Sequence, residues 1–100
     1  MNVGRIRHTV TFSLIHPEGS AEERDFLDAA RRLAIVPGVE AFEVLAQVGE
    51  KNGYRFGIWM EFADRAAYDG YNEHPDHVRF VQDRWLPEVS EFLELDYAAL

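Results

Sequence analysis

The sequence IRHTVTFSLI, residues 6–15, decides the fold, because its apolar and polar side chains alternate along almost its whole length. Side chains of an extended strand point alternately to opposite faces, so this pattern predicts a strand with one apolar face. The apolar face carries Ile6, His8, Val10, Phe12 and Leu14. The opposite face is rich in threonine and serine, which is typical of a half-buried interface. We therefore expect a second sheet to cover it.

Three further segments alternate in the same way. Residues 39–48 and 54–62 are separated by Gly49–Gly53, whose glycines and asparagine predict a hairpin turn and antiparallel pairing. In the second segment, one face is almost wholly aromatic or aliphatic and is expected to lie under the helices. Residues 92–97 predict a final strand.

Two helical segments lie between the strands. Ser20 and Glu23 have the spacing of a capping box, and an apolar stripe follows until Val36-Pro37-Gly38 ends the helix. The members of this stripe are Phe26, Ala29, Ala30 and Leu33. Asp64 is the expected N-cap of the second helical segment, which breaks at Pro75 and is expected to close at Leu86-Pro87.

The order of these elements is strand, helix, strand, strand, helix, strand. It predicts a ferredoxin-like βαββαβ fold of the α+β class, with a four-stranded antiparallel sheet and helices on one face. We expect residues 1–100 to form a single domain. The open face of the sheet would carry Thr9, Thr11, Trp59 and Leu93 or its neighbours, so we predict a homodimer joined through the sheet faces.

The composition disfavours several classes of partner. The chain has 10 Lys and Arg against 18 Asp and Glu, a net charge of −8, whereas nucleic acids and anionic membranes attract clustered basic residues. No apolar run approaches the roughly 18 residues of a membrane span, and no apolar block of signal-peptide length follows residues 1–8. We therefore expect a cytoplasmic protein that binds neither nucleic acid nor membrane.

The sequence also provides no motif for a cofactor. The chain has no cysteine, which excludes disulfides, thiolate catalysis and cysteine metal ligands. Its seven glycines are scattered at predicted turns and form no phosphate-binding loop. We predict no cofactor.

The candidate site combines His8, Tyr71 and His77. His8 lies on the apolar face of the first strand, and His77 begins the apolar stripe of the last helical piece. Both can therefore point into the space between sheet and helices. A neutral imidazole there can act as a general base, and a tyrosine hydroxyl can orient a carbonyl group. The alternative is that these side chains only hydrogen-bond within the core.

Other polar and aromatic residues are given simpler roles. His74 and His77 are spaced like a helical pair, but His74 precedes Pro75, so we predict a helix-start residue and no metal site. Tyr68 is expected to pack, and Trp59 and Trp85 to anchor the core or an interface. The carboxylates Glu88, Glu91, Glu94 and Asp96 are expected to form a solvated face around the last strand.

Several of these residues together resemble a known family, the stress-responsive dimeric α/β-barrel (Dabb) domains. The resemblance runs through His8-Thr9-Val10, Val36-Pro37-Gly38-Val39, Tyr71, His74-Pro75-Asp76-His77-Val78, Phe80-Val81, Trp85 and Asp96-Tyr97. It spans nearly the whole chain, and strand order alone would equally suit the related antibiotic-biosynthesis monooxygenases. The resemblance implies a dimer whose two sheets close into a barrel with the helices outside.

The resemblance implies two functions. Most members of the family have no assigned activity, which favours a stress-associated dimer that binds a small organic ligand beside His8, Tyr71 and His77. A plant branch contains polyketide cyclases, which close an aromatic ring by aldol condensation without a cofactor. In that branch the positions matching His8, Tyr71 and His77 are the working residues, with His77 as the general base.

Overall fold

The computed structural model describes residues 4–100. Met1, Asn2 and Val3, which belong to the N-terminal stretch considered for a signal peptide, lie outside the described residues. Within residues 4–100, no helix has both the length and the apolar character required to cross a membrane.

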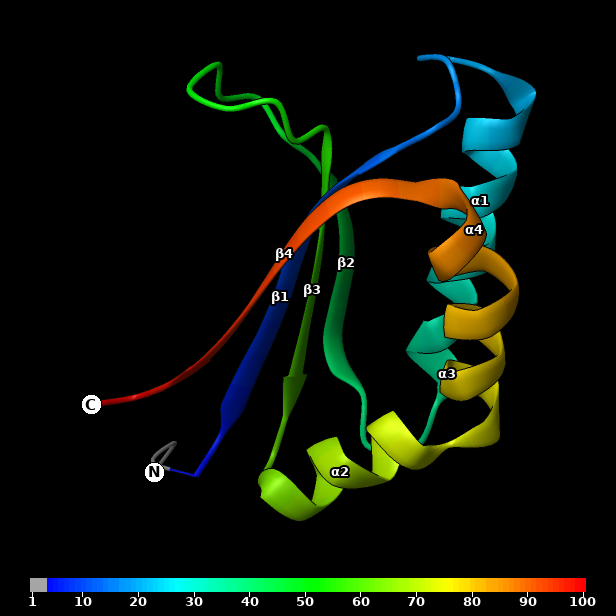
Figure 1. Cartoon of the computed structure of the whole chain (residues 1–100). Coiled ribbons are helices and arrows are strands. Elements are labelled where there is room, and N and C mark those ends of the chain that lie inside the picture. Colours follow the sequence, from blue (N-terminus) through cyan, green and yellow to red (C-terminus); the bar gives the residue numbers. More distant parts are fainter. Residues whose placement is uncertain (1–3) are drawn as a thin grey trace.

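Four strands form one antiparallel sheet in the order β2-β3-β1-β4 (Figure 1). They are Ile6–Leu14 (β1), Glu40–Ala46 (β2), Phe56–Phe62 (β3) and Val89–Ala98 (β4). β1 lies inside the sheet, with Thr9 opposite Trp59 of β3 on one side and Leu95 of β4 on the other. This arrangement confirms the predicted ferredoxin-like sheet.

The helices cover one face of this sheet (Figure 1). They are α1 (Ala21–Arg31), which continues into a 3-10 turn η1 (Arg32–Ile35), then α2 (Arg65–Glu73), α3 (Pro75–Phe80), a π-helical turn η2 (Val81–Trp85) and α4 (Leu86–Glu88). The last three elements follow one another without an extended residue between them. The prediction that this segment closes at Leu86-Pro87 is therefore short by one residue, because Pro87 is tolerated near the start of the final turn.

The predicted helix starts are present, with one difference. The Ser20 hydroxyl accepts a hydrogen bond from the Glu23 amide at 3.1 Å, as in a capping box. The Glu23 carboxylate accepts from the Gly19 amide at 3.0 Å instead of from Ser20, whose own amide donates to the Pro17 carbonyl at 3.1 Å. The Glu23 carboxylate thus accepts from the amide one residue earlier than in a standard capping box, because the Ser20 amide is already bonded within the preceding turn.

The break between α2 and α3 is also built from local hydrogen bonds. Asp64 caps α2 by accepting from the Ala67 amide at 2.8 Å. His74 has extended backbone and caps α3, its Nδ1 accepting from the Asp76 amide at 3.1 Å, and Pro75 follows at the first helical position. The predicted role of His74 as a helix-start residue is therefore confirmed.

The hairpin between β2 and β3 has a longer connection than predicted. The strands were expected to extend to Val48 and to begin at Tyr54, but β2 ends at Ala46 and β3 begins at Phe56. The Gln47 side chain lies inside this loop, where its amide donates to Asn52 Oδ1 at 2.8 Å. The Tyr54 amide donates to Asn52 Oδ1 at 3.0 Å, and the Tyr54 carbonyl accepts from the Gln47 side chain, so side chains satisfy backbone groups that a longer ladder would have used.

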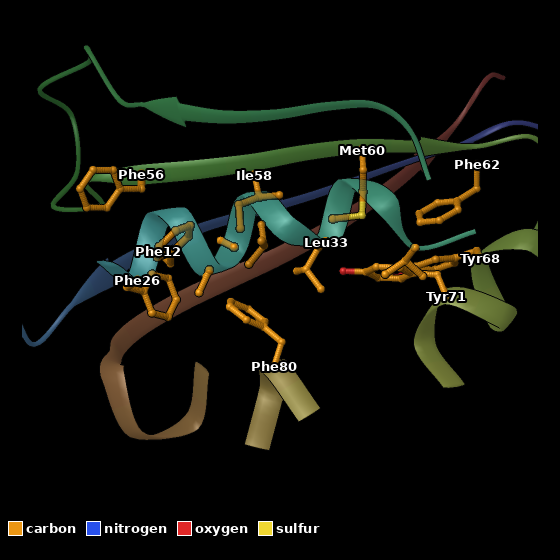
Figure 2. Close-up of a cluster of buried hydrophobic side chains, with 14 of the residues drawn as sticks. Phe12, Phe26, Leu33, Phe56, Ile58, Met60, Phe62, Tyr68, Tyr71 and Phe80 are labelled. Carbon is orange, nitrogen blue, oxygen red and sulfur yellow. The ribbon is translucent and has the colours of Figure 1, made fainter. Parts of the chain in front are cut away.

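The core lies between the sheet and the helices, where alternate residues of β1 and β3 meet the apolar faces of α1, α2 and α3 (Figure 2). Phe12, Phe26 and Phe62 are fully buried. The predicted stripe of the first helix is buried throughout: Phe26, Ala29, Ala30 and Leu33. Periodicity therefore assigned the inward faces correctly.

The sheet face away from the helices, here called the open face, is partly apolar. It carries Thr9, Thr11 and Trp59, which are half-buried, and Leu93, Leu95 and Tyr97, which are exposed. Trp59, Thr9 and Leu95 form one row across three strands. The structure thus places apolar side chains on the face that the sequence predicted.

Candidate functional site

A cavity of about 220 Å³ lies between the sheet and the segment from α2 to α4. Its walls are largely apolar and include Leu33, Ile58, Met60, Phe80, Trp85 and Phe92, several of which appear in Figure 2. Its polar lining residues are His8, Tyr71, Asn72, His77 and Glu94. All three predicted site residues therefore line the same cavity.

His8 is oriented by polar side chains on its Nδ1 side. Its side chain lies on the inward face of β1, and only 6% of the residue is exposed. The Asp96 carboxylate, directly opposite on β4, lies 2.6 Å from His8 Nδ1. Because a carboxylate only accepts hydrogen bonds, Nδ1 carries the proton, and Nε2 is the nitrogen left for other partners.

Tyr68 is the third member of a hydrogen-bonded network with His8 and Asp96. Its hydroxyl donates to Asp96 Oδ2 at 2.7 Å and lies 3.1 Å from His8 Nδ1. Burial, reinforced by the bond to Asp96, raises the pKa of Tyr68, so the hydroxyl remains a neutral donor. The expectation that Tyr68 only packs is incomplete, because its ring is buried while its hydroxyl fixes Asp96.

The prediction for Asp96 is incomplete. Asp96 is exposed, as expected for a solvated face with Glu88, Glu91 and Glu94, but both of its carboxylate oxygens are hydrogen-bonded to His8 and Tyr68. The β1–β4 register places it directly opposite His8. Alternation along the last strand specifies which residues share a face but cannot reveal which of them meets a histidine across the ladder.

The prediction that Glu88 lies on a solvated face is wrong, because its side chain is largely buried. Its carboxylate accepts from Arg84 Nε at 2.6 Å and lies 2.7 Å from His16 Nε2. Its side chain is largely buried, in line with a role in tying the end of β1 to the last helical turn. Glu91 and Glu94 are exposed, as predicted.

Tyr71 faces the cavity with an unused hydroxyl. Only 2% of the residue is exposed, and its ring packs against Phe62 and His77 at centroid distances of 5.2 and 4.3 Å. Within residues 4–100 its hydroxyl makes no hydrogen bond, although the residue lines the cavity. Burial raises the pKa of Tyr71, so the group is a neutral phenol able to donate to a ligand.

His77 is oriented by the backbone that precedes α3. Its Nδ1 lies 3.1 Å from the Asn72 carbonyl oxygen, which can only accept, so Nδ1 carries the proton and Nε2 has the free lone pair. Burial lowers the pKa of His77, an effect that the Asn72 bond opposes and the nearby His8 reinforces. The imidazole is therefore a neutral base at neutral pH.

The three predicted residues form a continuous series along the cavity wall. The Tyr71 ring lies between the two imidazoles, 6.3 Å from His8 and 4.3 Å from His77 by ring centroids. The sequence did not identify Asp96, Tyr68, Asn72 or Glu94 as their neighbours. Only the alternation of β4, which puts Asp96 and Glu94 on one face, contained a signal for two of them.

One group of side chains has the composition of a metal site. Atoms of His8, Glu94 and Asp96 lie within 4.8 Å of one another. Asp96 already accepts from His8 and Tyr68, so hydrogen bonds account for this arrangement, and a cation would have to displace them. His8 and Asp96 are thus a hydrogen-bonded pair in which Asp96 orients His8, and Glu94 lies beside them without a hydrogen bond among residues 4–100.

Comparison with known proteins gives a consistent result. A family described as the stress responsive A/B barrel domain matches residues 6–99. A crystal structure of a Dabb family protein with a ferredoxin-like fold from Mesorhizobium loti is 57% identical, covers 97% of this chain and 98% of its own, and superposes with a TM-score of 0.94.

More distant structures share the fold alone. A dimeric ferredoxin-like protein of unknown function from Thermobifida fusca is 19% identical, with a TM-score of 0.80 over 96% of this chain and 92% of its own. A hydroxynitrile lyase from Passiflora edulis is 14% identical, with a TM-score of 0.85 over 98% of this chain and 95% of its own.

None of the curated proteins compared with the chain matches it. The family match covers nearly the whole sequence, and the Mesorhizobium loti structure agrees with it in both sequence and fold. The chain therefore belongs to the family of stress responsive A/B barrel domains.

Proposed function

We propose that the protein binds a small organic molecule in the cavity beside His8, Tyr71 and His77. The observation that carries this proposal is the Tyr71 hydroxyl, which belongs to a buried residue, lines the cavity and has no hydrogen-bond partner among residues 4–100. No fully buried side-chain nitrogen or oxygen atom of residues 4–100 lacks a hydrogen-bond partner, so this hydroxyl is still reached by solvent. Exchanging water for a ligand oxygen or nitrogen that accepts from the hydroxyl would contribute about 0.5–1.5 kcal/mol.

The shape and lining of the cavity support the same proposal. Ligand pockets are typically apolar clefts with a few convergent polar groups, and those that hold drug-sized ligands measure roughly 300–1,000 Å³. The volume here, about 220 Å³, favours a smaller molecule. Its apolar part would contact the walls formed by Ile58, Phe80 and Trp85, while its polar group would meet Tyr71 and His77.

Screening small aromatic and aliphatic carbonyl compounds and alcohols by protein-observed NMR tests this proposal. We expect at least one compound to shift the signals of Tyr71 and His77, with about tenfold weaker binding to Tyr71→Phe and to His77→Ala. Tyr54→Phe is the matched control, because it removes a phenol that does not line the cavity. Equal affinity for Tyr71→Phe and wild type, or no binding by any compound, would overturn the proposal.

A second function, cofactor-independent enolate chemistry, is favoured by the state of His77. Its Nδ1 is hydrogen-bonded to the Asn72 carbonyl, and burial lowers its pKa, so Nε2 is available as a base. In an aldol-type ring closure, Nε2 would take a proton from the carbon beside a carbonyl whose oxygen accepts from Tyr71. The enolate carbon would then bond to a second carbonyl carbon of the same molecule, and the imidazolium would return its proton to the resulting alkoxide.

Deuterium exchange isolates the first of these steps. In D₂O the enzyme should exchange the methyl protons of acetophenone, followed by NMR, faster than buffer alone. His77→Gln should slow the enzyme-dependent rate by roughly 10²–10⁴-fold, the usual contribution of a general base. A rate unaffected by this substitution would refute the role of His77 and leave the binding proposal standing.

We further propose that two copies associate through their open faces. The exposed Leu93, Leu95 and Tyr97 form an apolar surface with the half-buried Trp59, and the Thermobifida fusca protein of the same fold is described as dimeric. Sedimentation of the wild type should give a dimer at micromolar concentration and of Leu95→Arg a monomer. Ile35→Arg places the same charge on an exposed apolar residue of η1 and should remain dimeric.

A further inference from the structure

We propose that the cavity selects against organic anions and that Glu94 is the residue that sets this selectivity. The inference rests on the proposed binding function and adds the chemical class of the ligand. The cavity would accept an apolar molecule whose polar group is uncharged or cationic, and it would reject a carboxylate or phosphate of the same shape.

The first argument is the charge of the lining. Glu94 lines the cavity, and within residues 4–100 its carboxylate forms no ion pair or hydrogen bond. No arginine or lysine of the described chain lines this cavity. Arg79 and Arg84, on the segment beside it, are paired with Asp76 and with Glu88 and Asp25, respectively. Among the residues that the structure describes, the only formal charge on the cavity wall without a partner is therefore the negative charge of Glu94.

The two histidines do not reverse this balance. His77 donates its Nδ1 proton to a carbonyl group, and burial lowers its pKa, so the ring is neutral at neutral pH. His8 Nδ1 lies 2.6 Å from the Asp96 carboxylate, so the negative charge of Asp96 would balance a positive charge on the His8 ring. An organic anion entering the cavity would lose hydration without gaining a cationic partner, and it would be repelled by Glu94.

The surroundings of Glu94 favour the opposite charge. Phe92 precedes it on the same face of β4, and Trp85 meets Phe92 edge-on at a centroid distance of 5.6 Å. Both rings line the cavity together with Glu94. A carboxylate beside aromatic rings stabilises an organic cation by ionic and cation–π attraction. Phe92 is 53% exposed, which places this end of the lining near solvent.

Three probes of one shape test the inference: benzylamine, benzyl alcohol and benzoate. Their affinities are measured at neutral pH by NMR titration of wild type, Glu94→Gln and Glu73→Gln. Glu73→Gln makes the same charge change on an exposed residue of α2 that does not line the cavity. We expect wild type and Glu73→Gln to bind benzoate at least about tenfold more weakly than benzyl alcohol, and Glu94→Gln to remove most of this difference.

The outcomes separate the inference from the function on which it rests. Failure of all three probes to bind wild type would overturn the proposed binding function and this inference with it. Binding of benzoate as tightly as benzyl alcohol, or discrimination unchanged in Glu94→Gln, would overturn the charge selectivity alone. Because Glu94 is exposed on β4 and makes no hydrogen bond among residues 4–100, the thermal transition of Glu94→Gln should match that of wild type.

Discussion

The space between the sheet and the helices has two ends that differ in chemistry. The aromatic end contains Phe12, Phe26, Phe56, Phe80 and Trp85, and the polar end contains His8, Tyr68, Tyr71, His77 and Asp96. β1 contributes to both, because Phe12 and His8 lie four residues apart on the same face. One strand thus supplies a packing residue to one end and a functional candidate to the other.

The two ends are stabilised by different forces. At the aromatic end, Phe26 contacts Phe12, Phe80 and Trp85 at centroid distances of 5.6–6.2 Å, so dispersion and burial of apolar area dominate. At the polar end, a tyrosine–aspartate–histidine network orients His8, while the Tyr71 hydroxyl has no partner among residues 4–100. The comparison shows that apolar packing stabilises one end of this space and hydrogen bonds the other.

The largest expected effect comes from breaking the aromatic end. Phe26→Ala should lower the free energy of unfolding by about 3–5 kcal/mol, because it opens a cavity at a fully buried site. Phe92→Ala also deletes a ring that contacts Trp85, but its half-exposed position should limit the loss to about 1 kcal/mol. Urea denaturation measures both. Similar losses for the two variants would mean that the aromatic end does not dominate stability.

A smaller effect is expected from the network at the polar end. Tyr68→Phe removes the hydroxyl that donates to Asp96, and Asp96→Asn weakens the acceptor, each lowering the free energy of unfolding by about 1–2 kcal/mol. Because the groups share one network, the double variant should differ from the sum of the single variants by about 0.5–3 kcal/mol. Strict additivity in this double-mutant cycle would show that Tyr68 and Asp96 act separately.

The pH dependence of stability isolates His77. Its pKa is lower in the folded chain than the ordinary value of about 6.5, so the unfolded chain binds more protons between the two values. Stability due to the neutral ring is therefore fully present above about pH 6.5 and is lost as the pH falls through the lower folded pKa. His77→Gln, compared with wild type by denaturation at several pH values, should lack this loss. An unchanged slope in that window would contradict the prediction.

The smallest effect is expected outside both ends. Arg31 and Asp28 form an exposed pair on α1 at 2.7 Å, and Arg31→Ala should change the free energy of unfolding by less than about 0.5 kcal/mol. Thermal denaturation at low and high salt provides the measurement. A loss as large as that of Tyr68→Phe would show that surface charges matter as much as the polar network.

The fold was largely predictable from the sequence. Alternation in residues 6–15 and 54–62 identified the inward faces, and Ser20 and Asp64 marked helix starts that the structure confirms. Such signals are local, because a strand or helix repeats its side-chain direction at a fixed period. The hairpin length was less accurate, because side-chain bonds such as that from Gln47 to the Tyr54 carbonyl decide where a ladder stops. The end of the last helix was one residue too early, because Pro87 is tolerated near the start of its final turn.

The candidate site was only partly predictable. His8, Tyr71 and His77 were selected from their positions on inward faces, and the structure places all three on one cavity. Asp96 was missed because its partner His8 lies 88 residues away in the chain. Tyr68 was assigned to packing because periodicity shows that its ring is buried but not which group its hydroxyl contacts.

The sequence by itself therefore determined which residues face inward and where most elements begin. It also determined which polar side chains lie between the sheet and the helices. Only the tertiary structure decided which of them meet. The β1–β4 register brought Asp96 opposite His8, and the break at Pro75 set His77 against Tyr71. The physical reason is that periodicity is a property of one segment, whereas register and helix placement depend on packing between segments distant in sequence.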